Sequence, residues 1–149
     1  MKTSTAGQQF IQFWEGLRLK AYQDIGGVWT IGYGHTGPDV TPGLEITQYK
    51  AVSLMLQDLS RIEERVSEML VSTVSQQQFD ALISFAYNLG PMALHGSTLL
   101  RFLNGGNAAA AALQFIRWDH AGAVEVEALK RRREAEAAIF TNGDYTGRP

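Results

Sequence analysis

Residues 15–35, which read EGLRLKAYQDIGGVWTIGYGH, decide the fold of this chain. Two segments within them, Arg18–Tyr22 and Val28–Tyr33, are rich in aromatic and β-branched residues, and the residues between them include two glycines and an aspartate. This arrangement predicts a β-hairpin. Side chains alternate between the two faces of a strand, so Thr30 is expected on the face opposite the bulky apolar side chains of the second strand.

Apolar residues at helical spacing continue on both sides of this hairpin. A capping box, Ser or Thr followed three residues later by Gln, begins two of the helices, at Thr5 and at Ser75. Thr36 to Leu44 is expected to be a loop, because it holds two prolines and two glycines. The expected helices run from about Thr5 to Glu15, Thr47 to Leu70, residues 75 to 89, Ser97 to Leu103, Asn107 to Trp118 and Ala128 to Phe140.

These elements predict two lobes. A small β-hairpin lobe covers about residues 15–45 and a larger helical lobe about residues 75–149, and the long helix at about 47–70 joins them. The fold class is therefore α+β and mostly α-helical. A chain of 149 residues fits one domain, 1–149, and a cleft between two lobes is a natural place for a ligand.

Composition excludes several classes of function. The formal net charge is −2, so the molecule has no overall preference for nucleic acid. The chain has no cysteine, which excludes a disulfide framework and a thiolate nucleophile. No apolar segment is long enough to span a membrane, and the first residues lack the apolar segment of a secretory signal. We therefore expect no nucleic-acid partner and no membrane insertion.

Three other kinds of chemistry are set aside. Residues 32–37, GYGHTG, match the dinucleotide pattern G-x-G-x-x-G, but Pro38 and Pro42 follow and prevent the helix that must open there. The three histidines lie far apart and none has the spacing H-E-x-x-H, so neither a metal nor another cofactor is expected. The G-x-S-x-G pattern of a serine nucleophile is absent.

Three residues of the hairpin region could carry hydrolytic chemistry. Glu15 ends the first expected helix, where the negative end of the helix dipole and apolar neighbours favour the protonated carboxyl that a glycosidase acid needs. Asp24 in the turn and Thr30 on the second strand could face it and hold an attacking water. Taken one at a time, each has a simpler interpretation: a surface glutamate, a turn-forming aspartate and a β-forming threonine.

The combination of these residues with their neighbours resembles the phage T4-type lysozymes, glycoside hydrolase family 24. In that family a Glu, an Asp nine residues later and a Thr six residues further form the catalytic triad, and here this spacing falls on Glu15, Asp24 and Thr30. The chain departs from the family at residues 123–128, where relatives usually have a loop with Gly and Pro that borders the cleft. The matching strings are EGLRLKAYQD at 15–24, WTIGYGH at 29–35, FDALISFAYNLG at 79–90, GSTLLRFLN at 96–104, Trp118 and RRRE at 131–134.

The resemblance implies a role for each matching residue. Glu15 matches the general acid, and Asp24 and Thr30 match the pair that orients or activates water. His35 matches a structural histidine whose partner is Asp58. Arg132, in the basic run near the end of the chain, is expected to reach Glu15. The positions that match or lie near substrate-binding residues are Thr36, Tyr87, Asn88, Ser97 and Thr98, and core packing is an equal alternative for Tyr87.

The resemblance also implies a lysozyme-like fold and an endolysin. Such an enzyme is a muramidase that hydrolyses the β-1,4 bond between N-acetylmuramic acid and N-acetylglucosamine with inversion, and it lyses the host cell. It would be a monomer that waits in the host cytoplasm until a holin or another route releases it to the periplasm and cell wall. Two alternatives remain. The first is a lytic transglycosylase, which needs no positioned water, so the presence of Asp24 and Thr30 argues against it. The second is a lysozyme-fold protein that binds glycan or protein partners without cutting, and the intact triad argues against it.

Overall fold

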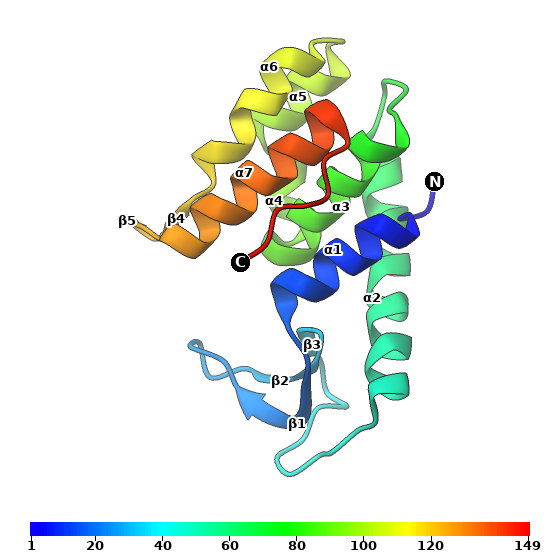
Figure 1. Cartoon of the computed structure of the whole chain (residues 1–149), viewed down its shortest axis with the longest axis vertical. Coiled ribbons are helices and arrows are strands. Elements are labelled where there is room, and N and C mark those ends of the chain that lie inside the picture. The colour runs from blue at the N-terminus through cyan, green and yellow to red at the C-terminus, as the bar shows by residue number, and fades with distance from the viewer. The chain divides into compact units, whose positions relative to one another are not determined.

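The computed structural model describes residues 1–149 and divides into two compact units. The hairpin unit comprises Glu15–Arg61, and the helical unit comprises Met1–Trp14 together with Ile62–Pro149. The helices are α1 Thr5–Glu15, α2 Gln48–Met69, α3 Gln76–Leu89, α4 Pro91–His95, α5 Thr98–Asn104, α6 Ala108–Gln114 and α7 Glu127–Asn142, with a 3-10 helix at Phe115–Arg117. The strands are β1 Arg18–Gln23, β2 Trp29–Gly32, β3 His35–Thr36, β4 His120–Ala121 and β5 Val124–Glu125 (Figure 1).

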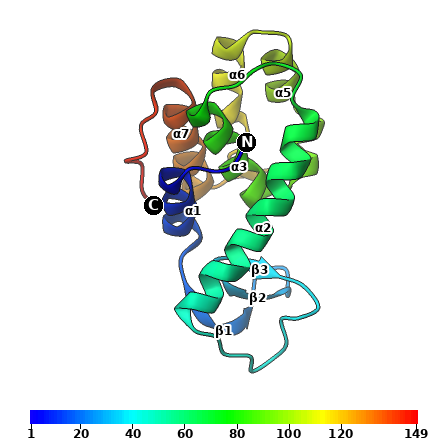
Figure 2. The ribbon, with the colours of Figure 1, turned by 90° about the vertical axis from the view of Figure 1, so that its right-hand side faces the viewer.

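The hairpin unit is built on a three-stranded antiparallel sheet with the strand order β1-β2-β3. The predicted hairpin is confirmed, since Gln23 pairs with Trp29 across β1 and β2. Ile31 on β2 is fully buried and packs with Leu54 from the first half of α2. Figure 2 shows α2 as one continuous helix, which runs from the hairpin unit into the helical unit.

The helical unit is organised around α3, whose residues 79–86 are all buried. Helix α7 packs along α3, and α5 packs against α6, as both ribbon views show. The Phe85 ring meets Phe115 and Trp118 edge-on, with ring centroids 5.9 Å and 5.4 Å apart. The core of this unit is therefore aromatic where α3 faces the elements that follow it. No helix has both the length and the apolar character that a membrane crossing requires.

The two predicted helix caps have different outcomes. At α3 the capping box is confirmed, because the Ser75 side chain accepts from the backbone N–H of Gln78 and the Gln78 side chain accepts from that of Ser75. At α1 the predicted cap on Thr5 is wrong. Ser4 caps this helix, since its Oγ accepts from the Gly7 N–H at 3.1 Å. The hydroxyl of Ser4 also donates to the buried carboxylate of Asp80, 76 residues away, and this tertiary bond fixes the cap one residue earlier.

Four elements were not expected from the sequence. Strand β3 lies at the start of a segment expected to be a loop. Helix α4 begins at Pro91, directly after Gly90 ends α3, because proline is well tolerated at the first position of a helix. Strands β4 and β5 form an exposed hairpin in the region where the chain departs from the T4-type sequences.

Candidate active site

Glu15 is the last residue of α1 and is half-buried. Gly16 follows it with a φ of 70°, a left-handed conformation that glycine adopts without steric cost. The helix therefore ends there and the chain turns into β1 at Arg18. This places the Glu15 carboxyl at a helix C-terminus, as predicted.

Asp24 lies in the turn between β1 and β2 and is exposed. Its Oδ1 accepts a hydrogen bond from the Val28 N–H at 2.8 Å, and its own backbone N–H donates to the Val28 carbonyl at 2.9 Å. Gly27, with a φ of 78°, closes the turn by donating its N–H to the Asp24 carbonyl at 2.9 Å. The second carboxylate oxygen, Oδ2, makes no hydrogen bond within the chain. One oxygen of Asp24 thus anchors the turn, and the other is available to a ligand.

Thr30 is buried on β2, only 4% exposed, although it lies on the face opposite Ile31. Its hydroxyl donates to the Val28 carbonyl at 2.9 Å. The hydroxyl proton is therefore committed, and the free lone pair of Oγ1 can only accept. Val28 consequently holds both candidate water-binding groups through its backbone, Asp24 by its N–H and Thr30 by its carbonyl. The sequence did not predict that Val28 positions these two groups, because a backbone hydrogen bond does not depend on the type of side chain.

The sheet places two further side chains beside Thr30. Thr36 on β3 and Tyr22 on β1 are its direct partners across the two antiparallel pairs. The guanidinium of Arg18 lies over the Tyr22 ring, 4.3 Å from the ring centroid. Directly opposed residues share one face of a sheet, so Thr36 is brought next to Thr30. Tyr22 was not among the candidate site residues, although it stands in one of the matching strings.

The contact expected between His35 and Asp58 is present. His35 is buried, with Nδ1 2.7 Å from the Asp58 carboxylate and Nε2 2.9 Å from that of Asp39. Burial alone lowers the pKa of His35, but the hydrogen bonds and charges of Asp58 and Asp39 outweigh it and raise the pKa above its ordinary value of 6.5. The bond with His35 lowers the pKa of Asp39 below 3.8. Asp39 had not been expected as a partner, although it lies four residues after His35 in the loop.

The helical unit carries the other candidate residues. Tyr87 and Asn88 lie half-buried in the last turn of α3. The Oδ1 of Asn88 accepts a hydrogen bond from Arg133 on α7 at 2.9 Å. Arg132 is buried beside Glu136, with its Nε 3.3 Å from Oε1 of that residue. The expected pairing of Arg132 with Glu15 stays a prediction.

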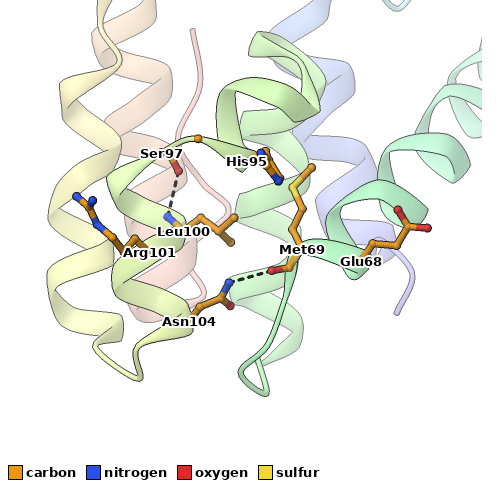
Figure 3. A pocket seen from close by; sticks show the side chains of 8 residues that line it. Glu68, Met69, His95, Ser97, Leu100, Arg101 and Asn104 are labelled. Atoms are coloured by element: carbon orange, nitrogen blue, oxygen red, sulfur yellow. Dashed lines mark hydrogen bonds between the residues drawn. The ribbon is translucent and has the colours of Figure 1, made fainter.

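Ser97 is the N-cap of α5 and Thr98 is the first residue of that helix. The buried Ser97 Oγ accepts from the Leu100 N–H at 3.0 Å and donates to the Leu94 carbonyl at 2.7 Å. Ser97 also lines a pocket of about 550 Å³, together with His95 and Asn104, and Figure 3 shows these side chains between the end of α2 and α5. Substrate binding by Ser97 and Thr98 remains a prediction, and the observed contacts of Ser97 are those of a helix cap.

Comparison with known proteins assigns the chain to a family. The Phage lysozyme family model matches residues 12–136, which include the candidate triad and most of the helical unit. The chain belongs to the phage lysozyme family. Within it, the chain is 44% identical to the endolysin of Bacillus phage B103 over 146 residues, which cover 97% of this chain and 56% of that protein. It thus spans about half the length of that relative.

Two other phage lysozyme relatives match nearly end to end. The endolysin of Salmonella phage P22 is 41% identical over 144 residues, which cover 94% of this chain and 98% of that protein. The solved muramidase domain of SpmX from Asticaccaulis excentricus is 38% identical, with a TM-score of 0.89 over 95% of this chain and 98% of that one. The lysozyme-like α+β fold expected from the sequence is confirmed by this agreement.

Proposed function

We propose that this protein is a muramidase of the T4 type, glycoside hydrolase family 24, which hydrolyses the β-1,4 bonds between N-acetylmuramic acid and N-acetylglucosamine in peptidoglycan and inverts the anomeric centre. Glu15 is the general acid, and Asp24 and Thr30 hold the attacking water. Membership of the phage lysozyme family supports the class of reaction. The names of the relatives, endolysin and muramidase, support the substrate.

The arrangement around Val28 carries the proposal. The Thr30 hydroxyl donates its proton to the Val28 carbonyl, and one oxygen of Asp24 is occupied by the Val28 N–H. Both groups can therefore only accept from a water molecule that lies between them. Such a water donates one hydrogen to Asp24 Oδ2 and the other to Thr30 Oγ1, so its lone pair is free to attack the anomeric carbon. Asp24 is then placed to take up the proton that this water loses.

Glu15 supplies the proton for the leaving group. Cleavage of the glycosidic bond needs an acid on the side of the bond opposite the attacking water, and an inverting enzyme separates its two carboxyl groups by about 6.5–9.5 Å. Glu15 ends α1 shortly before β1, and Asp24 directly follows β1, so this strand lies between them in the chain. One short strand thus separates the two carboxylates of the proposed reaction.

The biological role in this proposal is that of an endolysin, encoded by a phage or a prophage. The protein acts as a monomer and one lysozyme domain, without metal or cofactor. It stays in the host cytoplasm until a holin or another release route gives it access to the periplasm and cell wall, where it lyses the host. A lytic transglycosylase is the second candidate, and the occupied proton of Thr30 is the observation against it, because that reaction has no water to hold.

Digestion of purified peptidoglycan tests the proposed function. We expect new reducing ends, and the first product observed by NMR should have the anomeric configuration opposite to that of the β-linked substrate. Products that end in anhydro-muramic acid would instead establish the transglycosylase. Binding of glycan without any new ends in the wild-type protein would establish the non-catalytic alternative.

A further inference from the structure

The amide of Asn88 is held from one side only. Its Oδ1 accepts from an Nη of Arg133 at 2.9 Å, and its Nδ2 makes no hydrogen bond within the chain. Asn88 is half-buried at the end of α3, so the amide is not fully enclosed. The acceptor of this amide is therefore occupied within the fold, and its NH₂ donor is available to a ligand.

Arg133 decides which end of this amide faces inward. A guanidinium carries only donors, so the amide oxygen must face it and the NH₂ group must point away. Arg133 cannot reorient, because its side chain is fully buried, its Nε lies 2.8 Å from Oε2 of Glu136, and its guanidinium carbon lies 5.2 Å from the Phe85 ring centroid. The orientation of Asn88 is thus imposed by a cation that has one available position.

Glu136 holds Arg133 in that position and is itself held. Its Oε1 accepts from the Ser84 hydroxyl at 2.7 Å, from an Nη of Arg133 at 2.9 Å and from Nε of Arg132 at 3.3 Å. The carboxylate is fully buried, and so is Ser84. A buried network in which each member holds the others has few alternative arrangements, and this network contacts the half-buried Asn88 at the end of α3.

We infer that Arg133 is a positioning residue that presents the Asn88 Nδ2 group as a hydrogen-bond donor to an acceptor oxygen of the bound glycan. Among neutral acceptors of a peptidoglycan glycan, the carbonyl oxygen of an N-acetyl group is the strongest, and every sugar of the strand carries one. This inference rests on the proposed function, since it takes a glycan as the ligand. It assigns a role to Arg133 and a direction to the Asn88 amide.

Asn88→Asp keeps the hydrogen-bond acceptor of the side chain and removes its donor. The aspartate accepts from Arg133 as asparagine does, and the new ion pair keeps the fold, but the donor is lost. We expect KM for solubilised glycan strands to rise roughly tenfold to a hundredfold, with kcat within about threefold of wild type. Asn142→Asp, an exposed residue at the end of α7, introduces the same charge and should leave KM unchanged.

Substitutions of Arg133 test the positioning role. Lysine at this position still has only donors, so Arg133→Lys should retain most of the affinity. Methionine has a similar length and no donor, so Arg133→Met should let the amide turn over and raise KM nearly as far as Asn88→Asp does. Circular dichroism at the assay temperature shows whether each variant is folded. A folded Arg133→Met protein with the wild-type KM would overturn the positioning role.

NMR gives a readout that does not depend on catalysis or on the stability of Arg133 variants. A β-1,4-linked N-acetylglucosamine oligomer is added to the Glu15→Gln protein, and the side-chain NH₂ signals are followed. Those of Asn88 should shift, whereas those of Asn104, whose NH₂ donates to the Met69 carbonyl at 2.9 Å, should not. Unmoved Asn88 signals in the presence of bound oligomer, or a wild-type KM for Asn88→Asp, would overturn this inference alone. Failure of the wild-type protein to digest peptidoglycan would overturn the proposed function instead.

Discussion

The turn of the hairpin unit and the ion cluster of the helical unit hold polar side chains in opposite ways. In the turn, the exposed Asp24 and the buried Thr30 both bond to the backbone of Val28, and they lie within six residues of one another. In the cluster, Arg133 and Glu136 bond to side chains of α3 that lie 45 and 52 residues earlier, and they are fully buried. The hydrogen bonds of the turn join residues that are close in sequence, whereas those of the cluster join distant residues and are enclosed by the core.

This difference distinguishes polar groups that are available to a reaction from polar groups that stabilise the fold. The turn keeps an unoccupied carboxylate oxygen and a hydroxyl lone pair, which are the groups that a reaction can use. The cluster uses its buried charges on one another, so removing one of them leaves another without compensation. We therefore expect loss of the Asp24 carboxylate or the Thr30 hydroxyl to reduce activity more than stability. Loss of a charge from the cluster should reduce stability, and loss of Arg133 should in addition raise KM through Asn88.

The largest effect is expected for Glu15→Gln. The variant keeps the shape of the side chain but cannot donate a proton, so the rate of peptidoglycan hydrolysis should fall roughly 10²–10⁴-fold. The free energy of unfolding should hold or rise slightly, because a negative charge leaves a helix C-terminus. Glu45→Gln, an exposed glutamate of the same unit, is the control and should be fully active. Clearing of permeabilised cells by Glu15→Gln at the wild-type rate would refute the assignment of the acid.

The cluster should respond to Glu136→Gln with a loss of stability. Arg132 and Arg133 would then lack the carboxylate that both contact, and breaking a buried ion pair costs about 3–5 kcal/mol. Urea unfolding measures this loss as a lower midpoint. Arg131→Gln is the control, since Arg131 pairs with Glu127 at the surface and such a pair contributes at most about 1 kcal/mol. Equal midpoints for the two variants would mean that the cluster stabilises no more than a surface pair does.

Substitutions of two glycines, one in the turn and one in a loop, test whether the turn positions the candidate water-binding groups. Gly27 and Gly43 both have left-handed backbones, with φ of 78° and 82°, and neither has a neighbour that an added Cβ would meet. Alanine at either position should therefore cost a similar amount, about 1–2 kcal/mol. Only Gly27→Ala should also lower kcat, because it displaces Val28 and with it Asp24 and Thr30. If both variants lose the same small share of activity, the backbone of Val28 does not position the water.

The smallest effect is a pH dependence within the hairpin unit. Because the pKa of His35 is raised above 6.5, its contribution to stability is present below that pH and fades as the pH rises through the folded-state pKa. The pKa of Asp39 is lowered, so its contribution is present above 3.8 and fades as the pH falls through the folded-state pKa. His35→Asn should therefore lower Tm most between about pH 4 and 6.5. His95→Asn, at an exposed position, is the control, and a Tm difference that is constant from pH 4 to 9 would contradict this linkage.

The elements that the sequence predicted well are those with local causes. The C-terminal end of α1, the hairpin of β1 and β2 and the capping box at Ser75 all follow from residues within a few positions of one another. The predictions failed where a distant partner intervenes. Asp80 moves the cap of α1 from Thr5 to Ser4, and no local signal at either residue shows that this carboxylate lies nearby.

Sequence by itself determined the candidate triad, its spacing and the local structure that carries it. A turn with Asp24 and two glycines between two β-forming segments closes through backbone bonds, and alternation along β2 then sets the side of the sheet on which Thr30 lies. Only the tertiary structure decided the contacts of Asp39, Asn88 and Arg133. These side chains are oriented by charges that folding brings within hydrogen-bond distance, and a bond between two side chains 45 residues apart exists only after the helices that carry them have packed.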